Sequence, residues 1–170
     1  SANVLMLLLV LTIHAFVFHA ISAFLPLFLS TEKGIVLAYL GYYVAIPNVL
    51  GLFGRPIGGY LSDKIGRRSM TLISLASLAS GIILTVLARE TYWLILCLAV
   101  LGFGLHTVIP VLFAFLMDQF APSKRALMAG RINAVRHLIS GSSPTVVGTI
   151  ADSAGFSVAF LALAMAVLSN

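Results

Sequence analysis

Residues 58–68 read GGYLSDKIGRR, a short glycine-rich and charged segment that lies between two long apolar runs. Charge is scarce in this chain, since 9% of the 170 residues are charged and 61% are hydrophobic. A soluble domain carries roughly 25% charged residues. A chain that places several of its few charges in one polar turn is therefore predicted to be a polytopic membrane protein, in which that turn has a role of its own.

The apolar runs have the length of membrane-spanning helices. Crossing the hydrocarbon core takes about 20 apolar residues, and a helix satisfies its own backbone hydrogen bonds in lipid. The sequence therefore predicts an all-α membrane protein, a single unit over residues 1–170. Its six spans are expected at residues 4–29, 34–61, 70–88, 91–117, 124–150 and 154–168.

The basic residues of the predicted loops indicate the orientation. Six spans place both termini and the second and fourth loops on one side, which carries Lys64, Arg67, Arg68, Lys124 and Arg125. The opposite side carries Lys33 and Arg89, each beside an acidic residue. Excess Lys and Arg in short loops marks the cytoplasm. We expect a multi-pass protein of the plasma (inner, cytoplasmic) membrane with both termini cytoplasmic, and this explains the net charge of +5 better than a nucleic-acid partner does.

The polar turn has more structure than an ordinary positive loop requires. Gly54-x-x-x-Gly58 presents a groove for a neighbouring helix. Asp63 opens the turn, Gly66 permits a backbone conformation that other residues resist, and Arg67 lies four residues after Asp63, close enough to pair with it. The alternative is a positive-inside loop with incidental glycines.

This segment resembles the signature loop of the major facilitator superfamily, which follows the second helix of each six-helix half. The matching residues are Gly59-x-x-x-Asp63-Lys64-x-Gly66-Arg67-Arg68. Three further groups of residues resemble later motifs of the family. They are Asp118, Pro122 and Arg125; Gly102-x-Gly104 with Pro110; and Gly141-x-x-Pro144-x-x-x-Gly148-x-x-x-Asp152-x-x-Gly155. The similarity covers essentially all of the chain, and the loop motif is its specific part.

The resemblance implies that the chain is one half of a major-facilitator-type bundle, built from two three-helix inverted repeats. The other six-helix half would be its partner. Residues 23–27 and 148–160 look more like the family's seventh, eleventh and twelfth helices, which favours the C-terminal half. The first residue is Ser1 rather than Met, which favours a fragment. A self-contained six-helix protein that pairs with itself is the alternative.

By the same resemblance, the signature loop works as a cytoplasmic latch. Asp63 would meet a helix end of the partner half, where the helix macrodipole favours an anion, and Arg67 would pair with Asp118. Gly59, Gly66 and Arg68 complete the loop. The competing interpretation of the two arginines is membrane topology and attraction to lipid headgroups.

Cations inside the spans are candidates for a solute path. Arg136 lies about 18 Å along its helix from Lys124, and a deep arginine is costly unless it faces a wet cavity or a partner. Hydrogen bonds to helix-end carbonyls are the competing interpretation. His137 points about 100° away from Arg136. Arg55 lies about six residues inside its span and is expected to snorkel outward.

The other candidates for the substrate or proton path are polar groups within spans. A lone intramembrane histidine is more often a hydrogen bond between helices than a proton carrier, and for tyrosine packing or interface anchoring is the stronger expectation. The candidates are His14, His19, His106, Tyr43 and Asn48. No Asp or Glu falls in the middle of a span, and Arg136 favours an anionic substrate by charge complementarity.

The function predicted from these features is secondary active transport of a small solute by alternating access, as symport or antiport. A non-transporting membrane scaffold is the second hypothesis. An intramembrane hydrolase at Ser142 or Ser143 is disfavoured because Pro144 stands where such a site would need glycine. No metal-ligand cluster, nucleotide-binding loop or prosthetic-group motif is visible, so we expect a protein that is not an enzyme and needs no metal or cofactor.

Overall fold

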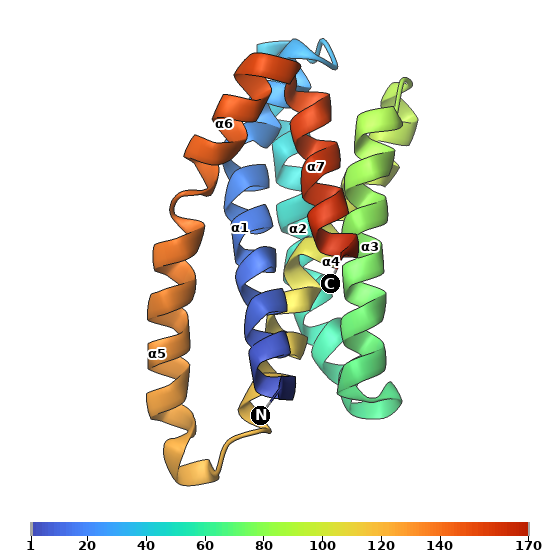
Figure 1. The fold of residues 1–170 in the computed structure, drawn as a ribbon. Coiled ribbons are helices and arrows are strands. Elements are labelled where there is room, and N and C mark those ends of the chain that lie inside the picture. The colour runs from blue at the N-terminus through green and yellow to red at the C-terminus, as the bar shows by residue number, and fades with distance from the viewer. Residues whose placement is uncertain (1, 170) are drawn as a thin grey trace.

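The computed structural model describes residues 2–169, with side chains from residue 4 onward, and every regular element in that range is a helix. Figure 1 shows the long helices α1 to α4 side by side, with α5 beside α1 and the shorter α6 and α7 after it. The elements are α1 (Ala2–Thr31), α2 (Leu37–Ile65), α3 (Arg67–Leu87), α4 (Thr91–Met117), α5 (Pro122–Ser140), α6 (Ser143–Ala154) and α7 (Phe156–Leu168).

Within residues 2–169, four helices are long and apolar enough to cross a membrane: Val4–Thr31, Leu37–Ile65, Arg67–Leu87 and Thr91–Met117. They match the first four predicted spans, and the ends of α1 and α2 and the start of α3 extend further into the polar segments. The loop expected at residues 62–69 is helical except at Gly66. Hydropathy marks the apolar part of a helix and not its end, because charged residues at the membrane surface can continue the helix.

The predicted fifth span, 124–150, is two helices and not one. The break lies at Gly141 and Ser142, and Pro144 stands in the first turn of α6. A proline lacks the N–H that a continuing helix would need and its ring clashes with the preceding turn, whereas it is well tolerated at a helix start. With 12 and 13 residues, α6 and α7 rise only about 18 and 20 Å. Six crossings therefore remain a prediction for the C-terminal third of the chain.

The loops fall at two ends of the bundle. The α2–α3 turn and the α4–α5 connection lie at the end where the N-terminus lies, while the α1–α2 and α3–α4 loops lie at the other end with α6 (Figure 1). The basic loops predicted for one side are thus at the same end of the molecule.

Helix α4 packs closely on α2 and α3 through glycines. Gly51, Gly54 and Gly58 of α2 are buried against α4, where a side chain at Gly58 would fall on the methyl group of Thr107. The Thr107 hydroxyl donates a hydrogen bond to the carbonyl oxygen of Gly54 at 3.2 Å. The predicted Gly54–Gly58 groove for a neighbouring helix is confirmed, and its neighbour is α4.

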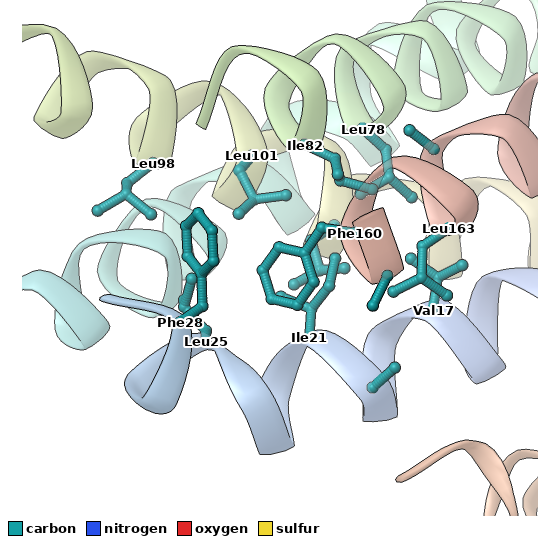
Figure 2. Close-up of a cluster of buried hydrophobic side chains, with 14 of the residues drawn as sticks. Val17, Ile21, Leu25, Phe28, Leu78, Ile82, Leu98, Leu101, Phe160 and Leu163 are labelled. Atoms are coloured by element: carbon teal, nitrogen blue, oxygen red, sulfur yellow. The ribbon is translucent and has the colours of Figure 1, made fainter. Parts of the chain in front are cut away.

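The main hydrophobic core joins α1, α3, α4 and α7 (Figure 2). Ile21 and Phe28 of α1 are fully buried, and the Phe28 ring stacks on Phe160 of α7 with 4.8 Å between centroids. Leu78 and Leu101 close the core from α3 and α4. This packing holds α7 against the long helices although it is too short to cross a membrane alone.

The α1–α2 loop joins two other helices at the end opposite the signature loop. The Glu32 carboxylate accepts hydrogen bonds from the backbone N–H of Ser157 at 2.9 Å and from the Ser157 hydroxyl, at the start of α7. Lys33 donates to the carbonyl oxygens of Val86 and Ala88, at 2.6 and 2.7 Å, where α3 ends. Each charge has the sign that the helix end favours. Burial lowers the pKa of Lys33 below its ordinary value, against the attraction of Glu32.

Candidate functional site

An ionic cluster of Asp63, Arg67, Asp118 and Arg125 lies at the end of the bundle that holds the α2–α3 turn. Arg67 Nε is 2.5 Å from Asp118 Oδ2, and Arg67 Nη2 is 3.5 Å from Asp63 Oδ1. Arg125 Nη2 lies 3.9 Å from the other oxygen of Asp118. Arg67 thereby connects the end of α2 to the end of α4, and the pairing with Asp118 expected from the resemblance is present.

The turn that positions Arg67 depends on Gly66. Gly66 has φ of +91° and ψ of 144°, a conformation that L side chains rarely adopt. It ends α2 and starts α3 within one residue, so that Arg67 occupies the first position of α3. The special backbone expected at Gly66 is confirmed.

The other two signature positions lie outside the ionic cluster. Gly59 has open space where a side chain would be. Arg68 lines a cavity of about 350 Å³ between α1, α3 and α4, whose wall is otherwise mostly apolar. Of the ion pairs within residues 2–169, none includes Arg68.

A second group of polar side chains is carried by α1, α2, α4 and α5, and we call it the histidine–arginine cluster: His14, His19, Arg55, His106, Arg136 and His137. His14 and His106 are buried, whereas Arg55 and His137 are exposed. His14 is fully buried, and its Nε2 donates to the carbonyl oxygen of Leu105 at 3.0 Å. His14 therefore bonds α1 to α4, as the bridging interpretation of an intramembrane histidine predicts. Arg55 Nη2 donates to Nδ1 of His106 at 3.1 Å and joins α2 to α4.

Aromatic contacts connect the members of the histidine–arginine cluster. The ring of Phe18 lies 6.4 Å from His14, 5.8 Å from His19 and 5.6 Å from His106, measured between centroids. The His19 ring in turn meets the His137 ring of α5 at 5.9 Å. All four histidines of the chain thus lie in one continuous set of ring contacts, which spans α1, α4 and α5.

Arg136 and His137 are bonded to each other. Arg136 Nη2 donates to Nε2 of His137 at 3.0 Å, and the Nε atom of Arg136 is buried without a partner among the described residues. The two Cβ directions differ by about 100°, but the arginine side chain is long enough to turn back to its neighbour. The angle between the two positions therefore does not keep the side chains apart.

A model of the major facilitator superfamily matches residues 7–170. The chain belongs to the major facilitator superfamily. It is 33% identical to multidrug resistance protein 3 of Bacillus subtilis over 130 residues, which are 73% of this chain and 25% of that protein. It is 24% identical to "Probable galactarate/D-glucarate transporter GudP" of Pseudomonas putida over 139 residues, 78% of this chain and 30% of the relative.

A third relative is a triacylglyceride transporter of Mycobacteroides abscessus, 30% identical over 110 residues, which are 65% of this chain and 20% of that protein. The chain spans 20–30% of the length of these three relatives. Family membership and the four apolar helices make it a multi-pass membrane protein from a superfamily of transporters.

Tyr43 and Asn48, both predicted to line the solute path, lie in different surroundings. Tyr43 is partly buried and packs on the main hydrophobic core. Asn48 lines a cavity of about 270 Å³ together with Arg55 and His106, and its Nδ2 donates to the carbonyl oxygen of Val44 at 2.9 Å. The structure therefore joins Asn48, and not Tyr43, to the histidine–arginine cluster.

Arg55 is the member of the cluster that the sequence reasoning missed. Its expected snorkelling assumed that the span ends near residue 61, whereas α2 continues to Ile65. Arg55 lies 10 residues before that end and His106 lies 11 residues before the end of α4. Measured along the helix axes from these ends, the two residues are about 15 and 16 Å away. An arginine and a histidine at equal depth on adjacent helices were a usable signal of their contact.

Proposed function

We propose that this superfamily chain forms one six-helix half of a secondary transporter that moves a small solute by alternating access. One observation carries the proposal: Arg67 lies 2.5 Å from Asp118 and leaves the Asp63 side chain 69% exposed. The signature loop is thus anchored within this chain and also presents a carboxylate outward. Such a carboxylate suits the positive end of a helix in the other half.

The strength of the anchor fits a reversible latch. The side chains of Arg67 and Asp118 are 32% and 43% exposed, so solvent screens their attraction. Ion pairs of this kind contribute about 0–1 kcal/mol. Contacts of a few kcal/mol bias two conformations without trapping either of them. A contact of Asp63 with the other half can therefore bias the ratio of inward-open and outward-open states and still release, while the pair of Arg67 and Asp118 positions the turn.

The proposal includes the orientation and the partner. The turn at Gly66 and the α4–α5 connection would face the cytoplasm, both termini would lie on that side of the inner membrane, and the six crossings would form two inverted three-helix repeats. The basic residues gathered at one end of the bundle support this orientation. The other six-helix half would complete the transport path.

The histidine–arginine cluster is proposed as part of the solute path. It brings two arginines and four histidines together within the helices, and polar groups at that depth are expensive unless they serve a path or a partner. Its positive charge suits an anionic solute. The relative named for galactarate and D-glucarate gives modest support, because both compounds are carboxylates.

A test that needs no known substrate is hydrogen–deuterium exchange on the protein in nanodiscs. Alternating access predicts that Asp63→Asn raises exchange near the turn at Gly66 and lowers it at the opposite end, around the α1–α2 loop and α6. The matched control is Asp152→Asn, which removes an acid at that opposite end. A scaffold would respond at the altered end alone.

Reciprocal changes at the two ends in Asp63→Asn, absent from the control, would support the transporter. Exchange that changes only around residue 63, or equally in both variants, would contradict alternating access and favour the scaffold.

A further inference from the structure

The cavity beside α2 has the features of a binding site for one charged group. It measures about 270 Å³, and its polar lining residues are Asn48, Arg55 and His106, while its remaining walls are small or apolar. His106 is only 5% exposed. Gly51 lets the α2 backbone pack directly on the imidazole, because a Cβ at Gly51 would fall on the ring, 2.8 Å from Nε2.

The hydrogen bond from Arg55 fixes which nitrogen of His106 carries the proton. A guanidinium group only donates, so Nδ1 of His106, 3.1 Å from Arg55 Nη2, is the acceptor. Neutral His106 then carries its hydrogen on Nε2. That nitrogen is buried and has no hydrogen-bond partner among residues 2–169. An unsatisfied buried donor is unfavourable, and this nitrogen lies against Gly51, out of reach of a molecule in the cavity.

Nothing in the cavity wall neutralises Arg55. The five acidic residues of the chain lie at helix ends or in loops, and none of them lines the cavity. Arg55 lies six residues, about 9 Å, before Leu61, the last residue before the polar end of α2. Its remaining N–H groups are donors beside the cavity, and a charge inside a span needs a partner.

We propose that the Asn48–Arg55–His106 cavity binds the carboxylate of a small solute whose apolar body lies against the walls formed by α2. The planar guanidinium holds two carboxylate oxygens at once, a geometry that an ammonium group lacks. The hydrogen bond to His106 holds this guanidinium beside the cavity. This inference rests on the proposed transport function, because it places the solute on the path, and it adds Arg55 as the group that determines charge preference.

The probe pair is benzoate and benzamide, which share shape and differ in charge. Binding is measured by titration calorimetry on the protein in neutral phosphatidylcholine nanodiscs, with inorganic phosphate as a second oxyanion. Arg55→Lys keeps the charge and loses the planar guanidinium that can hold two carboxylate oxygens, so it should weaken benzoate binding by about tenfold. His106→Phe should weaken it similarly while keeping a ring against Gly51. The matched control, Arg131→Lys in α5, lies outside the cavity and should bind as the unaltered protein does.

Saturable benzoate binding that benzamide does not reproduce, weakened in both cavity variants but not in the control, supports the site. Binding of phosphate in preference to benzoate would overturn the carboxylate assignment. The site is also refuted if no anion binds, if benzamide binds equally, or if Arg131→Lys loses as much affinity as Arg55→Lys. Melting temperatures of the variants separate lost binding from lost fold.

The two proposals fail separately. Reciprocal exchange in Asp63→Asn together with absent benzoate binding would leave the transporter standing and remove only this site. In that outcome a carboxylate of the other half is the expected partner of Arg55.

Discussion

Replacement of Gly102 by alanine tests the close approach of α4 to α2. The added Cβ would fall on the Cα and carbonyl oxygen of Pro47 and lie 2.8 Å from its carbonyl carbon. All three atoms belong to the backbone, so no side-chain rotation relieves the clash. Ordinary van der Waals contact begins at 3.4 Å, and restoring it requires α2 to move by roughly 1 Å at this point.

The magnitude follows from two opposing terms. Overpacking of a tight interior costs about 1–3 kcal/mol, while replacing glycine by alanine in a helix returns about 0.5–1 kcal/mol. Gly102→Ala should therefore destabilise the fold by about 1–2 kcal/mol net. Gly41→Ala in α2 is the matched control, because no atom lies within 4 Å of its Cβ position. It should be neutral or stabilise by up to about 1 kcal/mol.

The assay is thermal unfolding in detergent, followed by circular dichroism. For a chain of this length, 1 kcal/mol shifts the melting temperature by about 2–4 °C. The two variants differ by about 1–3 kcal/mol, so Gly102→Ala should melt about 2–12 °C below Gly41→Ala. Equal melting temperatures for the two variants would refute the backbone contact between α2 and α4, and with it the depth match between Arg55 and His106.

Three further changes test other parts of the fold. Gly66→Ala should lower the unfolding free energy by about 1–3 kcal/mol because of its positive φ, whereas Gly59→Ala, with open space around it, should not; equal melting temperatures would contradict this. Glu32→Gln should weaken the start of α7 by about 0.5–1 kcal/mol, seen as faster amide exchange there, and unchanged exchange would remove the capping role. A double-mutant cycle of Arg67→Gln and Asp118→Asn should give a coupling energy of about 0.5–1 kcal/mol in unfolding; zero coupling would mean that the pair contributes nothing in solution.

The hydropathy pattern predicted the first four helices because each is a long apolar run bounded by charge. It placed the end of α2 four residues early, since residues 62–64 are polar although they continue the helix. The same pattern missed the division of the fifth span. Pro144 alone does not predict this division, because whether a proline bends or breaks a helix depends on the packing of the flanking segments, which a single sequence does not contain.

The candidate site was predictable to the extent that it depends on motifs. The Arg67–Asp118 pair came from resemblance, and Gly66 came from its backbone freedom. The contacts of Arg55 and Arg136 were not foreseen, because long side chains reach partners that helix angles alone do not indicate. Phe18, which touches three histidines, carried no signal at all in the sequence, since an aromatic residue in an apolar run is ordinary.

The glycine contacts also limit what the ionic cluster can do. A Cβ at Gly104 would fall on the backbone of Leu78, and one at Gly81 would lie 2.5 Å from the Cα of Leu101, so α3 and α4 touch backbone to backbone. Helices packed this closely have little room to separate. Arg67 and Asp118 therefore join two helices that already move together, and their ion pair positions the turn more than it closes a gap. The group left to report motion is Asp63, whose side chain is 69% exposed. If the signature loop is a latch, its moving contact must be with something outside α2, α3 and α4.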